Sequence, residues 1–275
     1  MTPGPVALVG SGEYLPVMTE VEGGLLAGRP PRFVQLPTAA APEGPASLAR
    51  WTALGRAQAE RLGVEAVPVL VRDRDDAQDP ALAGLVEGAG LVYLSGGNPP
   101  YCASTLRGTL VWQAVERAWR GGAALAGCSA GAMALTSWVP DIRHPMADAE
   151  DGLGVVPALR VIPHFDRFVG WMPDLVTRYL TRPPDGVSVL GIDEDTAMVW
   201  RDGRWTVQGR QSVWLLTREG REEHGPGSVV DVPGPVLGRD ASEAASDRTA
   251  GWESRDEESA GEASADEQAG EQAAG

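Results

Sequence analysis

The sequence predicts an α/β fold with three layers, in which a mostly parallel sheet is flanked by helices. The first observation is a regular alternation of short apolar runs with helical patterns in the first half of the chain. The runs are apolar nearly throughout, which is typical of parallel strands covered on both faces. The second observation is that three runs end in glycine-rich turns, at 10–12, 96–97 and 127–131. Ligands of such sheets bind where the strands end.

The expected elements follow one another along the chain. Strands are expected at Val6–Val9, Pro31–Leu36, Val64–Val71, Gly90–Ser95 and Ala123–Ala126. Helices are expected at Pro45–Gly63, at Pro80–Glu87 and around Val111–Ala118, with a charged turn over 72–78. The second half is less regular, with a polar loop at 138–151, strands at Leu159–Ile162 and Val187–Ile192, a helix ending at Tyr179, and a C-terminal antiparallel extension at Met198–Trp200, Trp205–Val207 and Val213–Leu216.

Charge divides the chain into a folded domain, 1–238, and a tail, 239–275. The net charge is −15, and the segment from Asp240 onward carries −9 of it with no apolar period. We expect this acidic tail to be disordered. The remaining net charge of −6 argues against nucleic acid as a partner. The chain contains no lysine, which excludes lysine chemistry.

The sequence also predicts a cytoplasmic protein. The apolar run at Val6–Val9 is too short for a signal peptide, and no segment reaches membrane-spanning length. Cys102 and Cys128 are the two cysteines, and neither stands in a metal-binding or redox-pair spacing. We therefore expect reduced thiols, no metal and no cofactor.

The segment around Ser129 carries the strongest chemical signal. The strand at Ala123–Ala126 runs into Gly127-Cys128-Ser129-Ala130-Gly131, which fits the pattern Gly-x-Ser-x-Gly. This pattern is typical of a nucleophile on a sharp turn from a strand into a helix. Small neighbours keep the turn tight, and the helix N-terminus faces the reacting oxygen. Close strand–helix packing without chemistry is the alternative interpretation.

A serine nucleophile needs a base, and the chain has three histidines. His164 follows an apolar run, so we expect it at a strand end beside Ser129. His144 and His224 lie in polar segments that favour surface positions. Glu194 follows another apolar run and is the expected acid, on the same sheet edge. An α/β-hydrolase order would instead combine Ser129 with Asp195 and His224, which places the base in a charged turn.

Four motifs together resemble the cyanophycinase and aspartyl dipeptidase family of serine peptidases. They are Gly96-Gly97-Asn98, Gly127-Cys128-Ser129-Ala130-Gly131-Ala132, Pro163-His164-Phe165 and Gly191-Ile192-Asp193-Glu194-Asp195-Thr196-Ala197. The resemblance spans Val6 to Leu216 and implies the fold of class I glutamine amidotransferase domains. It implies that Ser129 is the nucleophile, His164 the base and Glu194 the acid.

The resemblance also implies an oxyanion hole made by the N–H groups of Gly97 and Ala130. It leaves the acid open, because the aspartyl dipeptidase branch carries an aspartate between the serine and the histidine. That aspartate would be one of Asp141, Asp148 and Asp151. We favour Glu194, because a strand end fixes the backbone of a carboxylate better than a polar loop does.

Departures from the family pattern bear on the substrate. Cyanophycinases typically carry Gln where this chain has Pro99, and Asp-Gln where it has Ile162-Pro163, so cyanophycin itself is not expected. We expect an aspartyl or β-aspartyl peptide or isopeptide, cleaved through an acyl-enzyme. We expect Asn98 and Arg167 to contact this substrate. Arg167 would bind a substrate carboxylate, and the alternative interpretation is a salt bridge to a neighbouring acid. A thiol glutaminase is disfavoured, because Cys128 stands beside the nucleophile position.

Two further points stay open at this stage. A non-catalytic ligand-binding domain of the same fold is the second functional hypothesis. A homodimer is the one assembly hypothesis, and the sequence leaves the oligomeric state open.

Overall fold

The computed structural model describes residues 2–141, 144, 148–167, 181–182, 185–217 and 219–236. The chain divides into two compact units, Met1–Val236 and Leu237–Gly275. The second unit, and with it the expected acidic tail, lies outside the described residues. So does the expected helix up to Tyr179, apart from its first residues.

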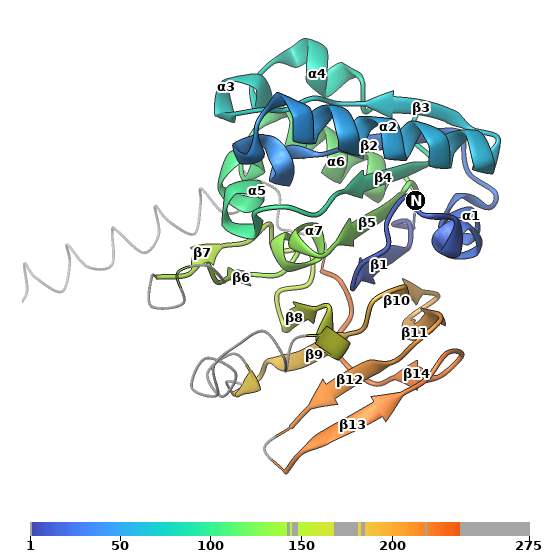
Figure 1. Cartoon of the computed structure of the whole chain (residues 1–275), viewed down its shortest axis with the longest axis vertical. Helices are drawn as coiled ribbons and strands as arrows, with labels where there is room; N and C mark the ends of the chain where they lie inside the picture. Colours follow the sequence, from blue (N-terminus) through green and yellow to red (C-terminus); the bar gives the residue numbers. More distant parts are fainter. Residues whose placement is uncertain are drawn as a thin grey trace, which may run out of the picture. The chain divides into compact units, whose positions relative to one another are not determined.

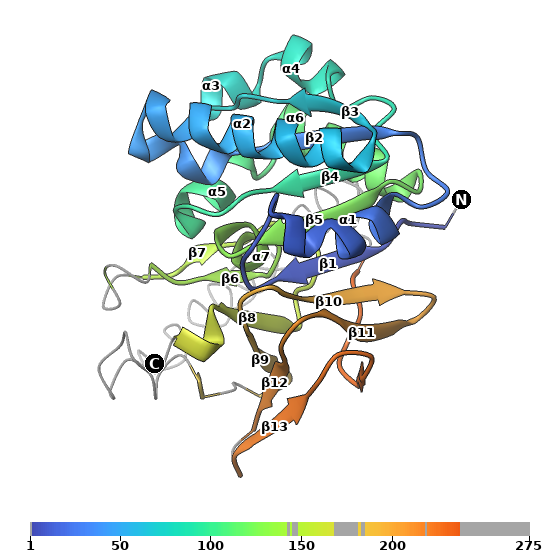
Figure 2. The ribbon, with the colours of Figure 1, turned by 45° about the vertical axis from the view of Figure 1, so that its right-hand side comes forward.

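The first unit is built around an eight-stranded sheet (Figures 1 and 2). Its strands, in spatial order, are β14 (Val229–Val230), β11 (Arg204–Gly209), β10 (Thr196–Arg201), β1 (Val6–Val9), β5 (Ala124–Cys128), β4 (Leu91–Leu94), β2 (Arg32–Leu36) and β3 (Glu65–Pro68). The five strands from β1 to β3 run parallel. Strand β10 pairs with β1 in the antiparallel sense, and β11 and β14 continue that way.

The large sheet has a hydrophobic core on each face. Because successive strand residues point to opposite faces, Val6 and Leu8 of β1 belong to one core, and Ala7 and Val9 to the other. The first core includes residues of α3 (Arg74–Ala77), α4 (Pro80–Gly84), α5 (Pro99–Leu106), α6 (Leu110–Arg120) and α7 (Ala130–Ala134). The second includes α1 (Thr19–Leu26) and α2 (Pro45–Leu62). Two helical layers around one sheet confirm the predicted three-layer fold.

The chain after α7 also forms a second sheet, of four strands (Figure 1). Its order is β13 (Arg221–His224), β12 (Val213–Leu216), β9 (Ser188–Ile192) and β8 (Leu159–Pro163), with β8 and β9 parallel. A two-stranded ribbon, β6 (Trp138–Val139) and β7 (Glu150–Asp151), precedes it. The expected antiparallel extension is therefore divided, because its first two strands, β10 and β11, join the large sheet while its third, β12, joins the second one.

Several local elements differ from the sequence expectation. The expected turn over 72–78 contains α3, because the Asp73 side chain caps the helix by accepting a hydrogen bond from Asp76 N–H at 2.9 Å. The expected loop at 138–151 contributes β6 and β7. Helix α1 was not expected, since Gly23 and Gly24 weaken its helical propensity. Two short 3₁₀ helices, η1 (Pro16–Met18) and η2 (Thr38–Glu43), complete the unit.

A buried acid links α1 to α2 in the second core. Glu22 is 1% exposed, and its carboxylate accepts hydrogen bonds from Tyr14 N–H and from the side-chain amide of Gln58. Arg61 Nε in turn donates to Gln58 Oε1 at 2.6 Å. Burial raises the pKa of Glu22 to about 7, although the two hydrogen bonds to its carboxylate lower it.

Glu22 should make stability depend on pH. The folded state keeps the Glu22 proton up to about pH 7, whereas the unfolded chain releases it near its ordinary pKa of 4.5. The contribution of Glu22 to the unfolding free energy should therefore be highest below pH 4.5 and fall as the pH rises towards 7, by up to about 3 kcal/mol.

Denaturant titrations of the wild type and of Glu22→Gln at pH 5 and pH 8 isolate this contribution. Other titrating groups cancel in the difference between the two proteins, and the glutamine cannot ionise. The wild type should lose about 2–3 kcal/mol relative to the variant between the two pH values. A difference that is the same at both would show that Glu22 is already ionised in the folded protein at pH 5.

Candidate active site

Strand β5 brings Ser129 to the carboxyl edge of the large sheet. Ser129 is the N-cap of α7 and has φ 49° and ψ −110°, a rare conformation for a residue with a side chain. The flanking residues have no room for a side chain. A Cβ on Gly127 would lie 2.5 Å from the Gly131 carbonyl oxygen, and a Cβ on Gly131 would lie 2.3 Å from the Leu94 carbonyl oxygen. The Gly-x-Ser-x-Gly pattern therefore follows from the close approach of β4, β5 and α7.

Strand β8 ends directly before His164, which also has a positive φ, of 51°. The next residue, Phe165, is 5% exposed and stacks its ring against β9. A Cβ on Gly191 would lie 2.4 Å from Cγ of that ring, so only glycine fits beneath it. The ring of Trp214 lies 6.1 Å from the Phe165 ring. The strand on one side and the packed ring on the other fix the backbone that carries His164.

Glu194 lies in the three-residue connection between β9 and β10. Its N–H donates to Asp166 Oδ1 at 3.0 Å, and its carbonyl accepts from Gln211 Nε2 at 2.9 Å. The preceding Asp193 is 5% exposed and accepts from Trp214 Nε1 at 3.0 and 3.1 Å. These contacts hold the short connection in one conformation.

The three side chains meet in a continuous chain of hydrogen bonds. Ser129 Oγ lies 3.0 Å from His164 Nε2, and Glu194 Oε1 lies 3.0 Å from His164 Nδ1. The side chains of His164 and Glu194 are 26% and 30% exposed, so a ligand can reach them. The contact between Glu194 and His164 is the one that the strand-end argument predicts.

The sequence indicates that the three residues share one sheet edge, but in the structure they do not. Ser129 follows β5 of the eight-stranded sheet, whereas His164 and Glu194 follow β8 and β9 of the four-stranded sheet. The reason is that β8 pairs with β9 in the parallel sense, and the other edge of β9 pairs with β12 and not with β10. The site therefore lies where strand ends of two sheets meet.

The loop aspartates lie elsewhere among the described residues. Asp141 Oδ2 is 2.9 Å from Nδ1 of His144, whose side chain is 75% exposed. Asp148 and Asp151 are both exposed. These observations favour Glu194 over the loop aspartates as the partner of His164.

The α/β-hydrolase arrangement is also not favoured by the geometry. Asp195 is 3.5 Å from an arginine, Arg210, and His224 Nε2 is 3.5 Å from a glutamate of its own strand, β13. His164 occupies the position beside Ser129 that this alternative would assign to His224.

The two expected oxyanion donors flank Ser129. Ala130 is the first residue of α7, and its N–H precedes the first hydrogen bond of that helix, from Met133 N–H to the Ser129 carbonyl at 3.1 Å. On the other side, a Cβ placed on Gly96 would lie 3.6 Å from Ser129 Cβ, so the Gly96-Gly97 turn passes directly beside Ser129.

The turn at Gly97 is shaped by a close backbone contact. Gly97 has φ 140°, and a Cβ there would lie 2.3 Å from the Ala39 carbonyl oxygen. Asn98 N–H donates to the same carbonyl at 2.7 Å. The Asn98 side chain caps α5, since its Oδ1 accepts from Tyr101 N–H at 3.0 Å. No acceptor for the Gly97 N–H occurs among the residues that the structure describes.

Arg167 and Trp51 border the same region. Arg167 is 61% exposed, and its Nε lies 3.5 Å from Asp166 Oδ2 and 3.6 Å from Glu194 Oε2. Arg167 thus forms salt bridges to neighbouring acids, as the alternative interpretation of this residue expected. Trp51, from α2, is half-buried, and its ring approaches to 3.8 Å of a Cβ placed on Gly96.

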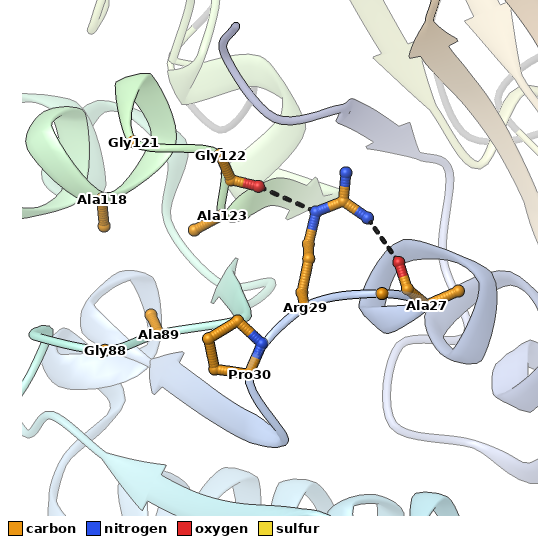
Figure 3. Close-up of a pocket in the computed structure, with 10 residues that line it drawn as sticks. Ala27, Arg29, Pro30, Gly88, Ala89, Ala118, Gly121, Gly122 and Ala123 are labelled. Carbon is orange, nitrogen blue, oxygen red and sulfur yellow. Dashed lines mark hydrogen bonds between the residues drawn. The ribbon is translucent and has the colours of Figure 1, made fainter. Parts of the chain in front are cut away.

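A hollow of about 490 Å³ lies at the opposite, amino-terminal end of the strands (Figure 3). Glycines, alanines and one proline, Pro30, line most of it, and Arg29 is its charged residue. The Arg29 guanidinium is engaged by backbone, donating from Nε to the Gly122 carbonyl at 2.8 Å and from Nη1 to the Ala27 carbonyl at 3.0 Å. This hollow offers no nucleophile or base.

Glu13 is a site neighbour that sequence reasoning passed over. It follows the Gly10-Ser-Gly12 turn at the end of β1 and is 5% exposed. Its carboxylate contacts Gly96 N–H and the Cys128 thiol. The sequence feature that could have identified Glu13 is an acidic residue after the turn that ends β1, on the edge of the sheet that carries Ser129.

No group of three or more His, Cys, Asp or Glu side chains in the described part of the chain is arranged to hold a metal ion. In the same residues, every helix is too short or too polar to cross a bilayer.

Comparisons with known proteins identify the family of the chain. Residues 7–208 match Peptidase family S51. Curated proteins named cyanophycinase, from Trichormus variabilis and from a Nostoc species, are each 31% identical over 167 residues, which is 57% of this chain and 55% of theirs. The chain thus spans about half the length of the curated relatives that it matches.

Solved structures give a similar result. The crystal structure of a peptidase from an acI-B1 actinobacterium is 40% identical, with a TM-score of 0.78 over 84% of this chain and 97% of that one. A putative peptidase E from Listeria monocytogenes has the same fold, with a TM-score of 0.55 and 16% identity over 76% of this chain and 99% of that one. With the match over 7–208, these findings show that the chain belongs to peptidase family S51.

Proposed function

We propose that the chain is a serine peptidase that cleaves a small peptide or isopeptide, with Ser129, His164 and Glu194 as its catalytic triad. The observation that carries the proposal is the unbroken hydrogen-bond chain from Ser129 Oγ through both ring nitrogens of His164 to Glu194 Oε1. A serine hydroxyl becomes a useful nucleophile when a positioned imidazole takes its proton. A carboxylate on the far nitrogen selects the required tautomer.

In this mechanism Ser129 Oγ attacks the substrate carbonyl carbon while His164 Nε2 accepts the hydroxyl proton. Glu194 stabilises the imidazolium that forms. The imidazolium then gives its proton to the leaving amine as the C–N bond breaks, which leaves an acyl-enzyme. Water then attacks the ester carbonyl carbon while His164 accepts its proton. His164 returns that proton to Ser129 Oγ as the C–O bond breaks and the acid product leaves.

The tetrahedral intermediates carry a negative oxygen that needs donors. We assign this role to the N–H groups of Gly97 and Ala130, which flank Ser129. Preorganised backbone donors of this kind are among the largest contributions to acyl transfer. The absence of an acceptor for Gly97 N–H among the described residues supports the assignment.

We propose an acidic peptide, aspartyl or β-aspartyl, as the substrate class. Arg167 is exposed beside Glu194, and its guanidinium can exchange a salt bridge for a substrate carboxylate. The curated relatives are named cyanophycinase. However, Pro99 and Pro163 take the places of polar residues expected in that family, so we propose a short acidic substrate and not the cyanophycin polymer.

Ser129→Ala should abolish hydrolysis and labelling by a fluorophosphonate probe. The probe forms a covalent bond only with an activated serine, so it also separates an enzyme from a non-catalytic binding domain. We expect the rate to fall about 10³-fold or more, while the melting temperature stays close to that of the wild type, because alanine has the same Cβ in the strained turn. Labelling of the variant at the wild-type rate would sink the assignment.

Glu194→Gln should lower kcat by about 10²–10⁴-fold, because glutamine fills the same space without the charge that stabilises the imidazolium. Asp141→Asn and Asp148→Asn are matched controls, since each removes one carboxylate from the polar loop. These two variants should keep wild-type rates. A loss of rate in either loop variant, with Glu194→Gln active, would move the acid to the loop.

A dipeptide panel tests the substrate class. We expect kcat/KM for α-aspartyl or β-aspartyl dipeptides to exceed that for the matching leucyl dipeptides by at least about tenfold, the scale of one charge-assisted contact. Arg167→Ala should raise KM for the acidic members with a smaller change in kcat. Equal cleavage of acidic and leucyl dipeptides would reject the acidic class while leaving the triad intact.

A further inference from the structure

Glu13 connects the two backbone turns that flank the nucleophile. Its Oε1 accepts a hydrogen bond from Gly96 N–H at 2.9 Å, and its Oε2 accepts one from the Cys128 thiol at 2.7 Å. Gly96 begins the turn that follows β4, and Cys128 is the last residue of β5, directly before Ser129. We propose that Glu13 is a positioning residue that sets the oxyanion hole against Ser129, an inference that rests on the proposed function.

The Gly96 bond is one of three that fix the turn. Ser95 N–H donates to the Leu36 carbonyl at 3.3 Å, Gly96 N–H to Glu13, and Asn98 N–H to the Ala39 carbonyl at 2.7 Å. Gly97 N–H, the proposed oxyanion donor, lies between the second and third of these anchors. Glu13 is the one side chain among the three acceptors. The direction of the Gly97 N–H therefore depends on where the Glu13 carboxylate is held.

Cys128 holds that carboxylate in place. Burial raises the pKa of the Cys128 thiol well above its ordinary value, so the thiol stays protonated and acts as the donor to Glu13. The thiol thus links Cys128, the residue before Ser129, to Glu13, which holds the Gly96-Gly97 turn. This contact also explains why position 128, which is fully buried, carries a cysteine with a thiol donor, although an alanine would fit the space.

Glu13 acts through Gly96 and not on the substrate. The carboxylate is 5% exposed, and both of its oxygens are already occupied by donors of the protein. Loss of the acceptor would leave a buried N–H without a partner and would free the turn to shift. A small displacement of a donor is enough to weaken an oxyanion hole, because its hydrogen bonds need a narrow range of distance and direction.

Glu13→Met and Glu13→Gln form a matched pair for the test. Methionine fills a similar volume without an acceptor, whereas glutamine keeps an oxygen for Gly96 N–H. The probe is an alkyl fluorophosphonate, whose P=O oxygen occupies the oxyanion position as Ser129 Oγ displaces fluoride and its proton passes to His164. We expect kinact for Glu13→Met to fall about tenfold or more with KI nearly unchanged, and Glu13→Gln to stay within about threefold of the wild type.

The pair separates positioning from mere packing. A purely structural role would lower the melting temperature without this split between kinact and KI. Wild-type kinact in folded Glu13→Met, or equal losses in both variants, would overturn the inference while the triad stands. Absence of labelling in the wild type would instead overturn the proposed function, and the inference with it.

Cysteine variants keep the test decisive if Glu13→Met does not fold. Cys128→Ala removes the second anchor of the carboxylate, and Cys102→Ala removes the other fully buried thiol, which lies in α5. Cys128→Ala should lower kinact about threefold or more, whereas Cys102→Ala should keep the wild-type value and lose only stability. Equal kinact in the two cysteine variants would count against the link through Cys128 and overturn the inference.

Discussion

The connection 193–195 is the constraint on which the site depends. In three residues the chain leaves β9 of the four-stranded sheet and enters β10, which pairs with β1 of the large sheet. Glu194 is the middle residue of this passage, so the crossing that joins the sheets also presents the carboxylate to His164. The passage is tight on both sides. A Cβ on Gly10 would lie 2.1 Å from the Asp193 carbonyl oxygen, and one on Gly209 would lie 2.3 Å from that of Asp195.

Backbone strain gathers at the same strand ends. Ser129, His164 and Asp195 all have positive φ values, between 49° and 55°, although none is glycine. Each such residue costs on the order of 1–3 kcal/mol, and persists where the surrounding structure fixes it. Here the fixing contacts are specific. The β4–β5–α7 packing holds Ser129, the buried Phe165 ring holds the residue before it, and hydrogen bonds to Asp193 and Glu194 hold the connection.

The sequence predicts the layers of the fold and the contact between Glu194 and His164 better than it predicts which strands form each sheet. Apolar runs and their glycine-rich ends identify the parallel strands, because those patterns depend on local chemistry. The division into two sheets depends instead on which strands pair at a distance, and nothing local in β8 or β9 distinguishes joining β10 from joining β12. Glu13 escaped notice for a similar reason, since its meaning lies in two distant partners, Gly96 N–H and the Cys128 thiol.

Two prolines show how the fold limits substrate recognition. Pro99 is buried at the start of α5, where a missing N–H costs nothing, and Pro163 is the last residue of β8, paired with Ile192. Both positions serve the backbone, and neither can offer a polar side chain to a ligand. Selectivity must therefore come from other side chains near Ser129. Among the described residues, the Trp51 ring beside the Gly96 turn and the exposed Arg167 guanidinium are placed to provide an apolar wall and a positive charge.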